Sequence, residues 1–168
     1  MAPAVPALAT IAEVTGAERY TMRSGHFLEK VLKHQSIEGW YDEYGGADPG
    51  YQTHGTFYLA WLCARGADGR LLASLRRAAH FQAMFLHPDG SLGGEYTSRN
   101  TQTYYPAGFE MLAGQDGSSA WIAEIMRPHV ASGRVADLAA VDAYNYFVFL
   151  NNFTFAARAL ATVTAVTA

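Results

Sequence analysis

The chain has 168 residues and a formal net charge of -3, with 50% hydrophobic and 16% charged residues. This composition excludes a disordered or acidic solvating segment, and the length is sufficient for one domain to bury a core. The nearest approach to a basic cluster is Arg70, Arg76 and Arg77. Nucleic acid is therefore excluded as the main partner, because phosphate binding requires a concentrated basic face.

The two ends of the chain are apolar. Residues 1–16 contain two prolines and lack the charged start of a signal peptide, so we expect a loose lead-in before a single helical domain over 17–168. Near the other end, Asn151, Asn152 and Arg158 interrupt the apolar run before it reaches the roughly 20 residues needed to span a membrane. The expectation is a soluble protein with no membrane span, cytoplasmic by default.

The first two predicted helices have clear signals. Apolar residues recur at three- and four-residue intervals over 17–34, the spacing of one helical face. After a polar loop, Asp48 followed by Pro49 is typical of an N-cap and a first helical turn. The second helix is predicted to continue from there to Gly66.

Four further helices are expected. The third covers 69–87, and the fourth covers 101–113, with Pro106 in or near its first turn because an interior proline costs about 3 kcal/mol. The last two are predicted over 118–130 and 135–160. No segment alternates polar and apolar residues over the length of a strand, so the predicted fold class is all-α.

Two segments resemble each other. Residues 36–60 and 89–113 each contain a double glycine and a Glu-Tyr pair, at 43–44 and 95–96, and each leads into a predicted helix that carries tyrosine. Matching the two pairs gives a period of about fifty residues, the length of two helices with their connections. Loops at equivalent positions of successive helix hairpins emerge at the same end, so the two loops are predicted to be neighbours on one face.

Helix hairpins of this length, with Gly-rich aromatic loops on one face, resemble the α/α-toroid enzymes: terpenoid cyclases, protein prenyltransferases, and toroid domains of polysaccharide lyases and some glycosidases. Within that set, EGWYDEYGGADPGYQT (38–53) and HPDGSLGGEYTSRNTQTYYPAGFEMLA (87–113) look most like uncharacterised toroid proteins of the heparinase and alginate lyase type. The resemblance covers 20–113 and implies an incomplete toroid of about three hairpins. A closed toroid has more hairpins, so a homo-oligomer or a missing remainder of the ring is expected.

The loops combine aromatic rings with carboxylates, amides and an arginine, which suits a sugar better than an isoprenoid. The expected partner is therefore a polysaccharide or oligosaccharide. The predicted substrate-binding residues are Trp40, Tyr41, Glu43, Tyr44, Asp48, Tyr51, Glu95 and Tyr96. The predicted catalytic residues are His54, Arg99, Asn100, Tyr104 and Tyr105.

The resemblance implies an enzyme that acts on an acidic polysaccharide by β-elimination or C5-epimerisation. Both reactions begin when a proton is removed beside a uronate carboxylate, and Arg99 with Asn100 are suited to neutralise that carboxylate. His54 and either Tyr104 or Tyr105 are candidates to remove the proton and to protonate the leaving oxygen.

Other interpretations remain open. A glycoside hydrolase would use two carboxylates, and a carbohydrate-binding or assembly module would need no catalytic group. Asp48 is also explained as a helix cap, and the two tyrosines as core residues. The histidines lack the spacing of metal ligands, so neither a metal nor another cofactor is predicted. The candidate hydrolase carboxylates are Glu43, Asp48, Glu95 and Glu110.

Overall fold

The computed structural model describes residues 1–66, 68–93, 103–136 and 138–167, and these ranges contain helices and no strand. The all-α class predicted from the sequence is confirmed. The helices are α1 (Ala4–Thr15), α2 (Glu18–Lys33), α3 (Pro49–Ala64), α4 (Gly69–Ala83), α5 (Ala107–Leu112), α6 (Gly117–Ala131) and α7 (Ala143–Thr167).

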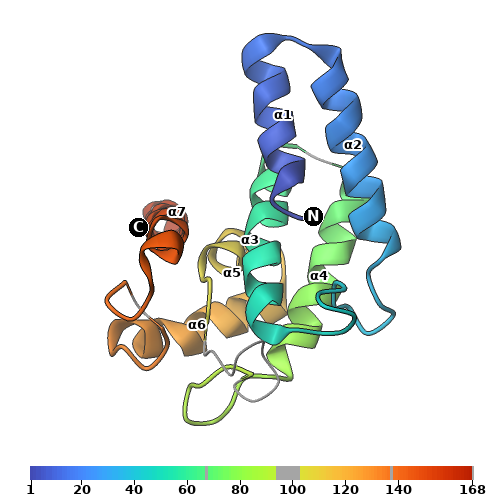
Figure 1. Cartoon of the computed structure of the whole chain (residues 1–168). Coiled ribbons are helices and arrows are strands. Elements are labelled where there is room, and N and C mark those ends of the chain that lie inside the picture. The colour runs from blue at the N-terminus through green and yellow to red at the C-terminus, as the bar shows by residue number, and fades with distance from the viewer. Residues whose placement is uncertain (67, 94–102, 137, 168) are drawn as a thin grey trace.

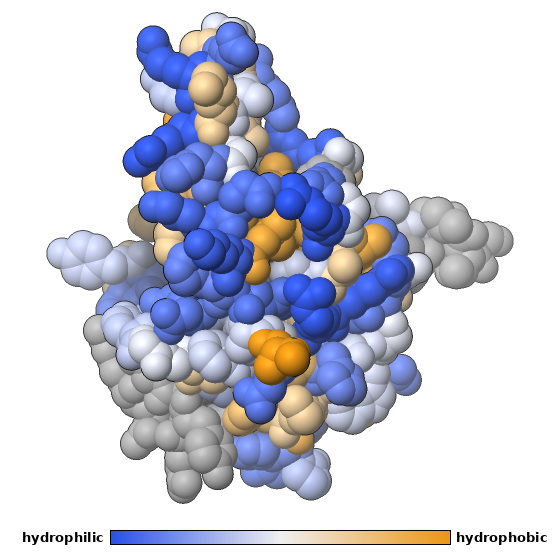
Figure 2. All heavy atoms as spheres, turned by 90° about the vertical axis from the view of Figure 1, so that its right-hand side faces the viewer, coloured by the Kyte–Doolittle hydropathy of each residue, from blue (hydrophilic) through white to orange (hydrophobic). Residues whose placement is uncertain are grey.

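The helices pack as successive hairpins (Figure 1). One row consists of α1, α3, α5 and α7, each of which contacts the next. The first three of these helices also pack against the helix that follows them in the chain, namely α2, α4 and α6. The face carrying α2 and α4 is mostly hydrophilic, as expected of an outer layer (Figure 2).

The N-terminal segment is a helix, and the expectation of a loose lead-in over 1–16 was wrong. Pro3 is the N-cap of α1 and Pro6 lies in its first turn, where the missing N–H has no helical partner to lose. Val5 is fully buried, and its carbonyl accepts a 2.8 Å hydrogen bond from Ser24 Oγ in α2. This contact fixes α1 against α2.

The predicted starts of α2 and α3 are confirmed. In α3 the Asp48 carboxylate accepts a hydrogen bond from Tyr51 N at 3.0 Å, and Pro49 occupies the first turn. Helix α4 ends four residues earlier than predicted, at Ala83, because 84–92 form a hydrogen-bonded connection instead.

Two later helices start after their predicted positions. Helix α5 begins at Ala107 with Pro106 as its N-cap, so Tyr104 and Tyr105 precede the helix. Helix α7 begins at Ala143 rather than at 135, because the Asp142 carboxylate accepts a 2.9 Å hydrogen bond from Asn145 N.

The connections after α2 and α4 have the same backbone structure. The first is closed by the bridge between Gln35 and Tyr41, and the second by the bridge between Leu86 and Leu92, 51 residues further along. Inside each, a backbone hydrogen bond closes a turn that ends at glycine, from Gly39 N to Ser36 O and from Gly90 N to His87 O. The helical repeat of about fifty residues is therefore confirmed, and both connections lie at the lower ends of their helices in Figure 1.

The core follows the hairpins. One buried cluster joins α1, α2, α3, α4 and α5, and a second joins α4, α5 and α6 with the connection after α4. The first includes Val5, Val31, Leu59, Ala60, Leu71, Leu75 and Leu112. The second includes Ala79, Leu92, Tyr104, Phe109, Ile122, Ala123, Met126 and Val135.

Candidate functional site

Tyr41 anchors the loop between α2 and α3 (34–48), which we call the first loop, to the helices around it. Its hydroxyl lies 2.7 Å from Ser74 Oγ in α4, and its N–H donates to Gln52 Oε1 in α3 at 3.1 Å. Burial raises the pKa of the phenol to about 12. Tyr41 therefore positions the loop, and its hydroxyl is already engaged by Ser74.

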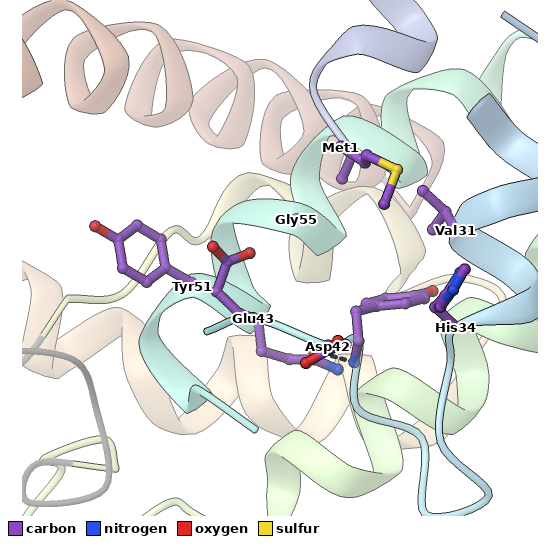
Figure 3. Close-up of a pocket in the computed structure, with 10 residues that line it drawn as sticks. Met1, Val31, His34, Asp42, Glu43, Tyr51 and Gly55 are labelled. Carbon is purple, nitrogen blue, oxygen red and sulfur yellow. Dashed lines mark hydrogen bonds between the residues drawn. The ribbon is translucent and has the colours of Figure 1, made fainter. Parts of the chain in front are cut away.

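A small cavity of about 70 Å³ lies beside this anchor, between the end of α2, the first loop, α3 and the start of the chain (Figure 3). Asp42 and Glu43 bring carboxylates to it, and Tyr51 and His34 lie at its sides. Ligand pockets usually measure about 300–1,000 Å³, so this cavity admits a single small group rather than a whole ligand.

Aromatic side chains form a row along α3, which we call the aromatic row; it consists of Tyr44, Tyr51, His54, Tyr58 and Trp61. The last four recur at three- and four-residue intervals, so they share one helix face, and each is half-buried. Tyr44, 75% exposed in the loop, meets Tyr51 edge to face with ring centroids 5.9 Å apart. The ring centroids of His54 and Tyr58 are 4.9 Å apart.

Tyr105 joins this row from the segment before α5. Its ring stacks on His54 with centroids 4.4 Å apart and an interplanar angle of 24°. The Tyr105 ring also meets the Phe149 ring of α7, again with centroids 4.4 Å apart. Tyr105 N donates to Thr53 Oγ1 at 3.1 Å, which fixes this segment to α3.

The His54 and Tyr105 side chains are both uncharged at neutral pH. Burial lowers the pKa of His54 to about 4, so its imidazole holds no extra proton. Burial, with smaller contributions from Tyr51 and Tyr58, raises the pKa of Tyr105, so its phenol keeps its proton. The stacked pair combines a neutral imidazole, whose Nε2 is buried without a hydrogen-bond partner among the described residues, with a phenol that keeps its proton.

Tyr104 lies in different surroundings from its neighbour Tyr105. It is 1% exposed, stacks on Phe109 with ring centroids 5.8 Å apart, and belongs to the core around α4, α5 and α6. Its hydroxyl has no hydrogen-bond partner among the described residues. Burial, with the nearby Glu110 carboxylate as a second cause, raises the pKa of Tyr104 well above its ordinary value.

The other predicted binding residues in the first loop have local roles. Trp40 Nε1 donates to Glu38 Oε2 at 2.9 Å. Glu43 N and Gly46 O, 2.9 Å apart, close the turn that contains Tyr44. Asp48 is buried and caps α3, which is the structural role that the sequence allowed for it.

Four predicted site residues, Glu95, Tyr96, Arg99 and Asn100, lie outside the described residues. Within the described ranges, no three or more His, Cys, Asp or Glu side chains are grouped as metal ligands would be. No described helix has both the length and the apolar character needed to cross a bilayer.

Sequence reasoning did not single out Tyr58 or Trp61, although their spacing from Tyr51 and His54 is visible in the sequence. It also missed Arg127, which forms an ion pair with Glu110 and has no local sequence signal. Neither a protein-family model, nor a curated protein, nor a solved structure matches the chain.

Proposed function

We propose that the aromatic row and the first loop bind a polysaccharide. The observation that carries this proposal is the half-buried series of rings on one face of α3, with Tyr105 stacked on His54 in its middle. Flat rings accept the C–H faces of sugars, and carboxylates accept sugar hydroxyls. From Tyr51 to Tyr58 the helix rises by about 10 Å, which is long enough for more than one sugar ring.

Within this proposal, His54 is the group that removes a proton and Tyr105 the group that donates one. In elimination, the imidazole takes the proton beside the uronate carboxylate, the electron pair forms the double bond, and the leaving oxygen receives the phenolic proton. A histidine with a low pKa is a weak base, so the substrate C–H must be made more acidic. That is the role proposed for Arg99 and Asn100, which would neutralise the uronate carboxylate.

The first experiment separates the reaction types. The purified protein is incubated with uronate-containing and neutral polysaccharides, and the ultraviolet absorbance of an unsaturated uronide is followed beside the appearance of reducing ends. Both signals together support the lyase proposal. Reducing ends alone contradict it and favour hydrolysis by carboxylates. Exchange of the uronate proton with solvent, without cleavage, identifies an epimerase.

Binding without turnover is the second candidate function, and the charge of the first loop favours it. Asp42 and Glu43 are both exposed there, and carboxylates attract sugar hydroxyls but repel uronates. A neutral polysaccharide bound in calorimetry without any cleavage would support this function over elimination.

Variants of the row test the binding surface itself. Tyr51→Ala and Tyr58→Ala should each weaken polysaccharide binding by about tenfold, the loss expected when one stacking ring is removed. Tyr144→Ala is the matched control, because Tyr144 is 92% exposed on α7 and lies outside the row. If both row variants bind the polysaccharide as tightly as the wild type and the Tyr144→Ala control do, the row is ruled out as the binding surface.

A variant of Arg99 distinguishes uronate recognition from general sugar binding. Arg99→Ala should abolish binding or turnover of uronate polymers while the helical circular dichroism stays unchanged. A variant that unfolds instead would show that Arg99 is structural, and the elimination proposal would lose its counter-ion for the substrate carboxylate.

A further inference from the structure

A second and larger cavity lies between α5, α6 and α7, and none of its lining residues belongs to the aromatic row. Its volume is about 290 Å³, and we call it the α5–α7 cleft. The walls are mostly apolar and include several alanines, which leave the space open. The apolar lining includes Pro106, Ala123, Val130, Phe153, Ala157 and Leu160.

The polar lining of the cleft is an ion pair with balanced charge. Arg127 Nε and Nη2 donate to the two carboxylate oxygens of Glu110 at 2.8 and 2.7 Å. The Glu110 side chain is 6% exposed, whereas that of Arg127 is 41% exposed. Because the guanidinium engages both oxygens of the carboxylate, the cleft has no net charge from this pair.

Tyr104 adds a hydroxyl group near the ion pair. Its hydroxyl is buried without a hydrogen-bond partner among the described residues, and the side chain lines the same cleft. Buried hydroxyls are normally hydrogen-bonded, so an unpaired one needs an explanation. A bound molecule that carries one oxygen would supply the missing partner.

We infer that the α5–α7 cleft binds a neutral, mostly apolar small molecule with a single hydroxyl or carbonyl oxygen. Because Glu110 and Arg127 already neutralise each other, the cleft offers a charged ligand no unpaired counter-charge, so either charge is disfavoured. An apolar protein cavity of about 150 Å³ holds benzene, so this cleft accommodates a ligand of about ten non-hydrogen atoms. The oxygen of the ligand pairs with the Tyr104 hydroxyl.

Three probes that share one ring system test the chemistry of the ligand: 2-naphthol, naphthalene and 2-naphthoate, each titrated into the full chain by calorimetry. We expect 2-naphthol to bind most tightly, naphthalene about fivefold more weakly for lack of one hydrogen bond, and 2-naphthoate most weakly. Absence of 2-naphthol binding, or tighter binding of 2-naphthoate, would overturn the inference.

Two variants locate the binding. Tyr104→Phe should lower the affinity for 2-naphthol about fivefold and leave that for naphthalene unchanged, since only the hydroxyl is removed. Ala157→Trp places a large ring on the exposed rim of the cleft without disturbing the core, and should abolish binding of both probes. The matched control is Ala7→Trp, at an exposed position of α1. Unchanged binding in Ala157→Trp would place the probe elsewhere and refute the assignment.

Discussion

Gly39 and Gly90 occupy equivalent positions in the connections after α2 and α4. Gly39 lies against α4, and Gly90 lies against α6. A Cβ on Gly39 would be 2.2 Å from the Arg77 carbonyl oxygen in α4, and a Cβ on Gly90 would be 2.2 Å from the His129 ring in α6. Both have positive φ, at 108° and 82°. The same close approach thus fixes each hairpin to the next one.

Gly39→Ala should destabilise the fold by about 2–4 kcal/mol, combining overpacking with a left-handed backbone that Cβ disfavours. Gly45→Ala is the control, because Gly45 also has positive φ but no atom lies within 4 Å of its added Cβ. Its cost should be about 1–2 kcal/mol, the backbone contribution alone. Urea unfolding followed by circular dichroism measures both. Equal losses would mean that the contact with Arg77 is unimportant.

The equivalence of the two connections was partly visible in the sequence. The double glycines and Glu-Tyr pairs at 43–44 and 95–96 revealed a repeat because they are distinctive over a few residues. The hydrogen-bonded turns before them, which contain the two close glycines, share little beyond glycine. Their likeness depends on backbone geometry, which different side chains can produce.

Local sequence signals predicted where helices start better than they predicted which side chains are in contact. Asp48 and Pro49 act within one turn, so the start of α3 could be read directly. The two prolines near the start of the chain predict a loose lead-in only when the start of α1 is unknown, because in its first turn they are compatible with a helix. The stacking of Tyr105 on His54 joins residues 51 positions apart, so no local pattern could reveal it.

Replacing Gln82 with an apolar residue of similar shape should stabilise the fold. Its side chain is fully buried in α4, and neither amide atom has a hydrogen-bond partner among the described residues. Gln82→Met keeps the shape and removes the unpaired groups, so the free energy of unfolding should rise by about 1–2 kcal/mol. Gln115→Met, at an exposed position, is the control and should change little. Destabilisation by Gln82→Met would show that the amide does find partners.

Removing one partner of the Glu110–Arg127 pair should lower the free energy of unfolding more than removing both charges does. Arg127→Met leaves the Glu110 carboxylate buried without its cation, and we expect a loss of about 2 kcal/mol because Arg127 is partly exposed. The double variant Glu110→Gln with Arg127→Met removes both charges and should recover most of that loss. Thermal and urea unfolding of the three proteins give the comparison. A double variant no more stable than Arg127→Met would mean that the unpaired Glu110 carboxylate does not destabilise the fold.

His54 should make the fold sensitive to mild acid. Its pKa in the folded chain is about 4, below the ordinary value of 6.5, because it is buried against Tyr58 and Tyr105. Between these two values the unfolded chain binds a proton that the folded chain does not, so stability falls as the pH is lowered through this window. From pH 7 to pH 5 this amounts to a loss of about 2 kcal/mol.

His54→Phe keeps a ring beside Tyr105 and removes the titration, so this variant should lose about 2 kcal/mol less than the wild type over the same pH change. The carboxylates are common to both proteins, and their contribution cancels in the comparison. His26→Gln, at an exposed position of α2, should follow the wild type. If His54→Phe loses as much stability as the wild type, the imidazole is not held neutral in the fold, and its proposed role as a proton acceptor loses its physical basis.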